Sequence, residues 1–529
     1  MTIMCKLGWR TLAIALLCAV IGVMVWGGGA RAADTLPPTI LRMGSQGDGV
    51  EALQRTLGTL GYSLVEDGIY GPVTRWAVWD FQRRHDGLAN DGVYGPQTRA
   101  YLLEALAQQE ENGDDEEPLT DYIQEGLEED HYLTLQSELQ VKPGLVPQAA
   151  VDEHRASLLV SEDDYDIIKE LHTQFPEGLV KELAYDQYPM AYDYFLVTTN
   201  VLNVRAEPTT RSPIVHRLNY FDKVNAIQVV RGQYLDRYQS DRWYRIFWHT
   251  QDRIEMGFVF GMLGQERQFR LEDMFEQVLA LDPVVEHSEV GYIFNYRHIH
   301  GMAPAYEGGN EDAYGESRNQ SAPGYVDLER SDFRYFPDGL FVSILDQQDD
   351  HYLVSTPSFS GEYWIPRNYI SFRNAPSRLR FVVVVDDMQQ NQGAFERVDD
   401  QWQLVSYTYT TTGTREGPHH FATPKGHFMA IERRPFFWYF EPGTSDISGF
   451  APYTIRFSGG GYIHGVPVQL RDDQTAQEVN PNDPSNHQEF LFTIGTTPRS
   501  RKCVRNFTSH AKFLYHWLKI GEGAVIVID

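Results

Sequence analysis

The sequence predicts a multidomain, mostly β protein with one small α-helical module near its N-terminus. At 529 residues the chain is too long for a single hydrophobic core. A short duplicated segment near the N-terminus has helical spacing, whereas most of the later chain consists of β-branched and aromatic runs separated by turn residues. Hydrophobic residues make up 42% of the chain and aromatic residues 13%, enough to build several cores.

The charge balance restricts the class of partner. The chain has 73 acidic and 45 basic residues, which gives a formal net charge of -28. A general nucleic-acid-binding protein presents a basic surface. We therefore expect no nucleic-acid partner.

The first 32 residues have the pattern of a secretory signal. Basic Lys6 and Arg10 precede an apolar run over 11–26, and small residues follow up to Ala32. An uncleaved membrane anchor is the alternative, because the run is only slightly short for a span. No later stretch is apolar enough to cross a bilayer, so we expect no membrane span after signal removal. The predicted location is outside the cytoplasmic membrane, in the periplasm or cell wall.

Residues 37–107 contain an internal repeat. DGIYGPVTRWAV at Asp67 recurs as DGVYGPQTRAYL at Asp91. Each copy has an Asp-Gly turn and a Gly-Pro pair, followed by a segment with helical spacing. Together with the preceding VEALQRTLGTLGY, the repeat predicts a small helical module.

This module resembles the peptidoglycan-binding domain of bacterial wall hydrolases. The resemblance depends on GSQGDGVEALQRTLGTLGY and on both copies of the repeat. It implies binding to the stem peptides or glycan of peptidoglycan, with Tyr70, Trp76 and Trp79 as wall-binding candidates. Packing in the module's own core is the alternative role for these aromatic residues.

Residues 108–190 are strongly acidic and predict a linker with helical patches, such as DYDIIKELHTQF at 164–175. Residues 191–264 contain LNVRAEPTTRSPIVHRL, DRWYRIFW and MGFVFG, and they resemble the bacterial SH3-type barrel. Residues 324–374 have similar short β-type runs, which predict a second SH3-like barrel.

The connector between these two regions, 265–323, includes a helix-like LEDMFEQVLALDP. A loop follows at 305–324 whose composition predicts an exposed, mobile segment. His298 and His300 lie one residue apart in HIHG, but a third ligand of matched spacing is missing. We therefore predict no metal site and no other cofactor.

The last region, 378–529, predicts a β-dominated domain. Strand-like runs such as RFVVVVDD, WQLVSYTYTTTG and GAVIVID recur with turn residues between them. Near its end, NFTSHAKFLYHWL over 506–518 has apolar residues at mostly helical spacing, which predicts a helix.

Cys503 is the candidate nucleophile of this domain. Of the 3 cysteines in the chain, the other two, Cys5 and Cys18, lie in the expected signal. Basic neighbours and a following helix N-terminus both favour a thiolate. The basic neighbours are Arg499, Arg501, Lys502 and Arg505. The alternative is an inert thiol that packs as a small hydrophobic residue.

Two groups of motifs then identify a family. TGTREGPHHFATPKGHF resembles the Thr-Gly and Thr-Pro-x-Gly-x-Phe signature of L,D-transpeptidases, and YIHG followed by SRKCVRN resembles their His-Gly and Ser-x-Gly-Cys-x-Arg-Asn elements. The motifs occur in family order over about the last 150 residues.

The resemblance implies an acyltransferase that acts on stem peptides. Cys503 would attack the carbonyl of the third stem residue and release the terminal D-alanine, and His464 would move the proton. An amine of a second stem, a protein or water would then take the acyl group. The resemblance also implies that the backbone N–H groups of Lys502 and Cys503 are the candidate oxyanion donors and that Arg505 binds the carboxylate of the substrate. It gives supporting roles to Gly465, which keeps the His464 backbone in position, and to Ser500 and Asn506, which support the loop.

The chain departs from the family at two places. Lys502 replaces the glycine that precedes the cysteine, and a lysine at a positive φ would be strained. The segment between His464 and Cys503 is also unusually long. Its polar insertion over 471–490 predicts a surface loop that could cover the cleft as a lid. His487 within the insertion is a remote alternative base.

Two other functions remain open at this stage. The departure at Lys502 allows a non-catalytic wall-binding scaffold with a degenerate transpeptidase domain. A papain-like wall endopeptidase is disfavoured because in that group the cysteine precedes its histidine along the chain, whereas only His510 and His516 closely follow Cys503 here. The sequence does not identify the acyl acceptor or the oligomeric state.

Overall fold

We describe a computed structural model of the chain. It covers 36–111 except 43, 61–67, 69, 71, 84, 86–87 and 89–91; 148 and 151–152; 165–249 except 186–189; 254–469 except 416–420 and 441–446; and 479–529 except 482–486 and 488–490. The expected signal, 1–32, and most of the expected acidic linker lie outside these residues. The described part divides into an N-terminal helical unit and a second unit that holds the β-sheets.

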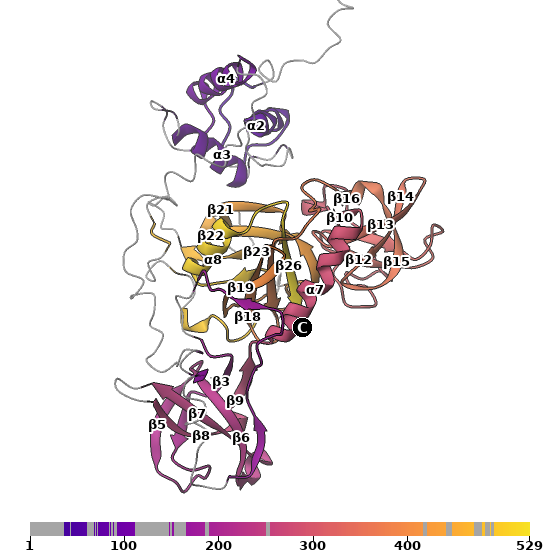
Figure 1. The fold of residues 1–529 in the computed structure, drawn as a ribbon. Helices are drawn as coiled ribbons and strands as arrows, with labels where there is room; N and C mark the ends of the chain where they lie inside the picture. Colours follow the sequence, from indigo (N-terminus) through magenta and orange to yellow (C-terminus); the bar gives the residue numbers. More distant parts are fainter. Residues whose placement is uncertain are drawn as a thin grey trace, which may run out of the picture. The chain divides into compact units, whose positions relative to one another are not determined.

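The helical unit has three helices: α2 (Asp48–Thr59), α3 (Pro72–Arg83) and α4 (Pro96–Glu111) (Figure 1). Apolar residues at helical spacing, among them Val50, Leu53 and Leu57 of α2, form its core. An isolated bridge between Leu41 and Tyr94 joins the start of the module to the second repeat. The predicted helical module is confirmed.

The first sheet is antiparallel throughout and has the order β5-β4-β8-β7-β6-β3-β9, with β1 added to β6. Its strands are β1 (Ile167–Glu170), β3 (Asp193–Val197), β4 (Val201–Arg205), β5 (Ile214–Asn219), β6 (Lys223–Leu235), β7 (Ser240–His249), β8 (Ile254–Phe260) and β9 (Gly264–Gln268). Strand β1 corrects one prediction, because it lies in the segment 164–175 that was expected to be helical. Its four residues are all exposed, and β6 supplies the backbone partners that decide its conformation.

The second sheet follows helix α7 (Leu271–His287) and has the order β12-β11-β15-β14-β13-β10-β16. Its strands are β10 (Val290–Ile293), β11 (Ser321–Tyr325), β12 (Phe333–Pro337), β13 (Phe341–Gln348), β14 (His351–Thr356), β15 (Phe359–Pro366) and β16 (Ile370–Ser371). Strand β10 and the first three residues of the fully buried β11 lie in residues expected to be a connector. The prediction of an exposed loop over 305–324 is therefore wrong for its last residues, and Asp312 within it is also buried.

The third and fourth sheets form the C-terminal region, with the orders β2-β19-β18-β17-β26-β20 and β21-β22-β23-β25. The third sheet contains β2 (Val180–Lys181), β17 (Phe381–Asp386), β18 (Asn391–Val398), β19 (Gln401–Tyr409), β20 (Gly426–Met429) and β26 (Gly523–Ile528). The fourth contains β21 (Glu432–Phe440), β22 (Ile447–Ser458), β23 (Gly461–His464) and β25 (Val504–Arg505), with β24 (Val468–Gln469) paired to β22. Helix α8 (Thr508–Trp517) confirms the helix predicted over 506–518.

The third sheet is buried on both faces, which explains its continuous apolar runs. Every residue of β17 is buried, and β17 pairs in parallel with the equally apolar β26. Val382 and Val384 face a core shared with α7, which packs on β17 and β18 (Figure 1). Phe381 and Val383 face a second core that includes Ile463 and Val504 of the fourth sheet.

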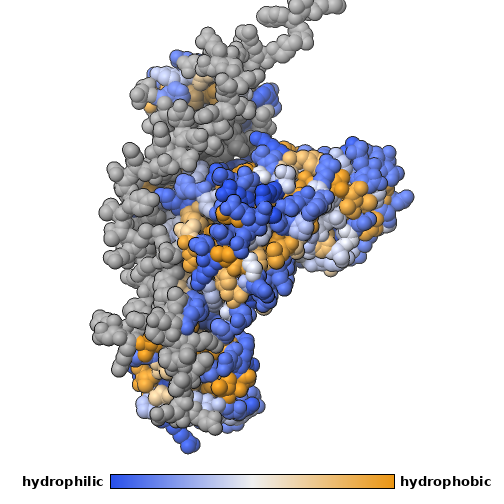
Figure 2. Space-filling view, viewed as in Figure 1, coloured by the Kyte–Doolittle hydropathy of each residue, from blue (hydrophilic) through white to orange (hydrophobic). Residues whose placement is uncertain are grey.

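On the face shown in Figure 2, hydrophilic residues surround smaller groups of hydrophobic ones in the described part of the chain. Among the described helices, none combines the length and the apolar character needed to cross a membrane.

Candidate active site

Cys503 lies directly before strand β25, and only 6% of its surface is exposed. Its Sγ donates a hydrogen bond to the Gly460 carbonyl over 3.6 Å. Burial raises the pKa of the Cys503 thiol to about 11, and the Tyr462 backbone and the charges of Arg505 and Lys502 offset this only in part. The thiol is therefore protonated at neutral pH.

The prediction of a thiolate stabilised by nearby cations is thus wrong for this structure. The reason is that loss of hydration outweighs the local positive charge. In addition, the Arg499 guanidinium lies over the ring of Phe221, in the turn between β5 and β6, 5.2 Å from its centre. Helix α8 begins only at Thr508, beyond β25, and the dipole effect falls off within the first turn of a helix.

His464 ends strand β23 and is fully buried. Its Nδ1 lies 2.5 Å from the Gly465 carbonyl oxygen and its Nε2 lies 3.0 Å from the Tyr439 hydroxyl. Burial, together with the Arg505 charge, lowers the pKa of His464 to about 3. The imidazole is therefore neutral. Donation from Nδ1 to the carbonyl leaves the Nε2 lone pair as the acceptor, directed toward Tyr439.

The register of the fourth sheet brings these two side chains to one face. Strands β23 and β25 are parallel, with Ile463 opposite Val504 and His464 opposite Arg505. Ile463 and Val504 both point into the hydrophobic core. Because side chains alternate along a strand, His464 and Cys503 lie on the opposite face, with Cys503 in register with Tyr462, two residues before His464. Within the described residues no hydrogen bond joins the thiol to the imidazole, since each has another partner.

Lys502 occupies the position at which the sequence suggested a strained backbone. Its φ is +74°, a left-handed conformation that costs a residue with a Cβ about 1–2 kcal/mol. Its N–H donates a 2.8 Å hydrogen bond to the Phe421 carbonyl. The candidate role of the Lys502 N–H as an oxyanion donor is therefore not supported, because that N–H already has a partner.

The motif that contains Thr411, Thr412 and Gly413 contacts residues 499–505, which we call the nucleophile segment. The Thr412 carbonyl accepts hydrogen bonds from the backbone N–H groups of Arg499 and Ser500, both at 3.0 Å. Thr411 and Arg505 exchange backbone hydrogen bonds of 2.9 and 2.8 Å. A Cβ on Gly413 would approach the Lys502 nitrogen to 2.7 Å, so only glycine permits this close contact.

The remaining predicted support residues also lie around Cys503. The Ser500 hydroxyl donates to the Cys503 carbonyl. The Asn506 N–H donates to the His464 carbonyl over 2.8 Å, and its side-chain oxygen lies 3.1 Å from Nδ1 of His510. Gly465 packs against α8, where an added Cβ would lie 3.1 Å from the Thr508 Cα.

The segment that joins β10 to β11 contributes residues to the site that the sequence did not reveal. Gln320, directly before β11, packs against Gly459, where an added Cβ would lie 2.7 Å from that of Gln320. The carbonyl of the next residue, Gly460, accepts the hydrogen bond of the thiol. The hydroxyls of Tyr296, in the same joining segment, and Tyr462 lie 3.0 Å apart. The turn between β22 and β23 beside the thiol is thus in contact with this segment.

The loop before β11 also approaches the nucleophile segment. Arg415 donates to the Gly315 carbonyl over 3.0 Å. The Glu316 carboxylate favours the charged form of Lys502, although burial lowers the pKa of the lysine amine overall. Burial likewise raises the pKa of Glu316. The sequence showed only the turn composition of this loop, and composition does not reveal what a loop contacts.

The other candidates are the aromatic residues of the helical module and His487. Tyr70 is fully buried in the core of the helical module, and its hydroxyl donates to the Gly92 carbonyl, so packing in the core is its role here. The side chains of Trp76 and Trp79 and most of the 471–490 insertion lie outside the described residues. His487 has its Nε2 2.9 Å from the Pro481 carbonyl oxygen.

Replacing Lys502 measures the strain directly. We expect Lys502→Gly to be about 1 kcal/mol more stable toward unfolding than Lys502→Ala, because only the alanine keeps a Cβ at positive φ. Both variants lose the same amine, so their difference isolates the backbone. Denaturant titration of the two proteins measures it, and equal stabilities would show that the position carries no strain.

Comparison with known proteins identifies two of the N-terminal domains. A peptidoglycan binding domain model matches residues 46–102, and a bacterial SH3 domain model matches residues 200–263. The chain therefore carries both domains, which confirms these two resemblances. None of the curated proteins matches the chain.

Several solved structures match parts of the chain at low identity. An L,D-transpeptidase from Mycobacterium smegmatis is 14% identical over 36% of this chain and 82% of its own, with a TM-score of 0.21. L,D-transpeptidase 1 of Mycobacterium tuberculosis is 13% identical over 32% of this chain and 78% of its own, with a TM-score of 0.19. A fused Zn-dependent amidase/peptidase and peptidoglycan-binding protein from Clostridium acetobutylicum is 13% identical over 93% of this chain and 100% of its own, with a TM-score of 0.19.

Proposed function

We propose that this chain is an exported L,D-transpeptidase-type enzyme that uses Cys503 as nucleophile and His464 as base on peptidoglycan stem peptides. The observation that carries the proposal is the placement of both side chains on one face of two adjacent parallel strands. The order of the sequence motifs supports it, and so does the peptidoglycan-binding domain at 46–102, which suits a wall substrate.

The reaction follows from the chemistry of these groups. Sγ of Cys503 forms a bond to the acyl carbon of the stem peptide while the thiol proton passes to Nε2 of His464. The amide bond to the terminal D-alanine then breaks, and the proton leaves with its nitrogen. In the second half, an amine or water attacks the thioester while its proton passes to Nε2 of His464, the C–S bond breaks, and the sulfur takes that proton to restore the thiol. Both ionisable groups start neutral, so this proton transfer accompanies the attack.

For the proton transfer, Nε2 of His464 must exchange the Tyr439 hydroxyl for the thiol of Cys503 as its partner. In this structure Tyr439 bonds to Nε2 and the thiol bonds to the Gly460 carbonyl. The thiol must leave the Gly460 carbonyl, and Nε2 must leave Tyr439, before the proton can pass between them. Such loosened contacts are common in ligand-free sites and tighten when substrate binds.

Two features favour the alternative, a non-catalytic wall-binding scaffold. One is the lysine at a positive φ directly before the nucleophile, and the other is the raised pKa of the buried thiol. Both lower reactivity relative to an exposed thiolate. Neither removes the nucleophile or the base.

Acylation by a carbapenem separates the two functions. The purified full chain is incubated with the drug and its intact mass is measured. We expect a single covalent adduct on the wild-type protein and none on Cys503→Ala, whose fold is checked by circular dichroism. The absence of an adduct on the wild-type protein, together with no release of D-alanine from stem peptides, would establish the scaffold instead.

A further inference from the structure

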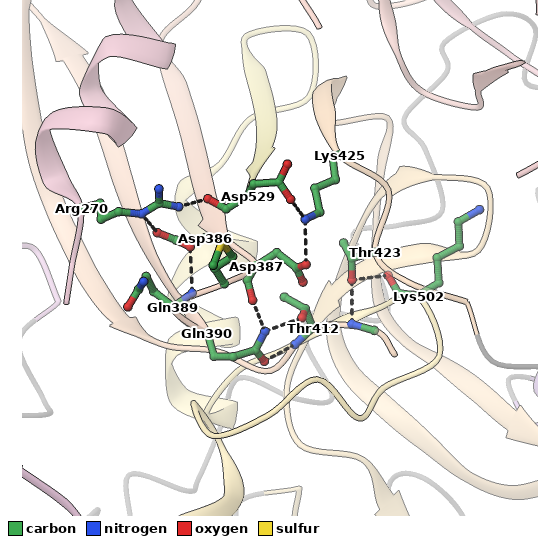
Figure 3. Close-up of polar contacts among 12 residues, drawn as sticks. Arg270, Asp386, Asp387, Gln389, Gln390, Thr412, Thr423, Lys425, Lys502 and Asp529 are labelled. Carbon is green, nitrogen blue, oxygen red and sulfur yellow. Dashed lines mark hydrogen bonds and ion pairs between the residues drawn. The ribbon is translucent and has the colours of Figure 1, made fainter. Parts of the chain in front are cut away.

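Thr423 is a buried threonine of the second motif whose hydroxyl joins two segments of the site. Its Oγ1 accepts a 2.8 Å hydrogen bond from the Gly413 N–H and donates a 3.1 Å hydrogen bond to the Lys502 carbonyl (Figure 3). Thr423 is 1% exposed, so water does not compete for either bond. Thr423 therefore holds the carbonyl group directly before Cys503.

This bond fixes the direction of the next N–H group. The described chain has no cis peptide bond. In a trans peptide the carbonyl and the following N–H point in opposite directions. Because the Lys502 carbonyl points at Thr423, the Cys503 N–H points away from Thr423.

The neighbouring peptide groups are held as well. The Lys502 N–H donates to the Phe421 carbonyl, and the Cys503 carbonyl accepts from the Ser500 hydroxyl. Three successive peptide planes around the nucleophile thus have fixed orientations. The positive φ of Lys502 turns the chain between the first two, and this turn requires a restraint because lysine disfavours it.

Further polar contacts hold the two segments that carry Gly413 and Thr423. Gln390 accepts from the Thr412 N–H and donates to the Thr412 hydroxyl, next to Gly413 (Figure 3). Lys425, close to Thr423 in the same motif, forms ion pairs with Asp387 and with Asp529. The segment that carries Thr423 is therefore anchored to the ends of β17 and β26.

We propose that Thr423 is a positioning residue that aims the Cys503 N–H at the oxyanion formed when Sγ attacks an acyl carbonyl. The inference rests on the proposed acyl transfer and assigns the donor role to Cys503 rather than to Lys502. A preorganised N–H stabilises the developing negative charge only when its direction is held before the reaction. The Thr423 hydroxyl provides that restraint without touching the substrate.

The test compares three variants by their rates of acylation by a carbapenem. Removing an oxyanion donor entirely slows catalysis by about 100- to 1000-fold. Thr423→Val loses only the restraint, and we expect the maximal acylation rate to fall about tenfold or more with an unchanged half-saturating concentration. Thr423→Ser keeps the hydroxyl and is expected to react within about twofold of the wild-type rate.

Thr454→Val is the matched control. Thr454 is also fully buried, and its hydroxyl donates to the Arg434 carbonyl over 2.9 Å. It should lose thermal stability without losing acylation rate. If Thr423→Val does not fold, Thr423→Ala replaces it with the same expectation.

The outcomes separate this inference from the proposed function. Full acylation of Thr423→Val, a failure of Thr423→Ser to restore the rate, or an equal loss in Thr454→Val would each overturn the positioning role alone. No adduct on the wild-type protein would overturn both.

Discussion

Lowering the pH from 7 to 5 is expected to remove much of the folding stability of the C-terminal region. Three buried histidines there are held neutral: burial lowers the pKa of His464 and of His510 to about 3, and that of His427 to about 4. Unfolding exposes them, and they then take up protons with a pKa near 6.5. The unfolded state therefore binds more protons than the folded state, and stability falls with falling pH.

The expected size of this effect is large. At pH 5 each histidine costs about 2 kcal/mol, and together they cost about 6 kcal/mol as an upper estimate. A typical domain has only about 5–15 kcal/mol of stability. Denaturant titrations at pH 5, 6 and 7 measure the loss, which begins below about pH 6.5 and continues until the folded-state values are reached.

Two variants test the assignment. His510→Gln removes one of the three groups and is expected to reduce the pH dependence by about a third. His287→Gln, at an exposed position of α7, should leave it unchanged. A stability that does not change between pH 7 and 5 would show that these histidines are not buried as described.

The acylation rate of Cys503 is expected to change by less than about twofold between pH 7 and 9. Burial raises the pKa of the thiol to about 11 and lowers the pKa of His464 to about 3, so both groups stay neutral over this range and the proton passes between them during the attack. Stopped carbapenem reactions analysed by intact mass measure the rate at each pH. Circular dichroism at the same pH values confirms that the protein stays folded.

A small free thiol provides the comparison, because its rate levels off near its ordinary pKa of about 8.5. A protein rate that rises about tenfold per pH unit between pH 7 and 8, as the rate of the free thiol does, would contradict this mechanism. That result would mean that hydroxide, and not His464, removes the thiol proton.

Several features of the fold follow from local sequence. The helical repeat, the strand-rich C-terminal region and helix α8 arise from hydrophobic spacing and turn residues, which act over a few positions. The run FVVVVD predicted a strand, and its six buried residues explain why no polar alternation interrupts it. Part of the segment at 164–175 is strand β1, although a helix was predicted there. The strand forms because it pairs with β6, which is distant along the chain, and local spacing does not record that pairing.

The site shows the same division. The motif order pointed to Cys503 and His464, and the parallel pairing of β23 with β25 places them on one face. Local charge predicted the wrong direction for the pKa of the thiol, because desolvation depends on everything packed around it. Gln320 and Glu316 were missed because they come from the loop before β11, which is distant along the chain from the motifs.

The sequence by itself determined the order of the chemical groups, the helical and strand-forming segments and the lysine at a position where glycine is usual. Only the tertiary structure decided which groups are charged, which N–H groups already have partners and which distant segment contacts the nucleophile. The physical reason is that hydrogen-bond partners and desolvation come from residues far apart along the chain, whereas spacing and motifs record only neighbours.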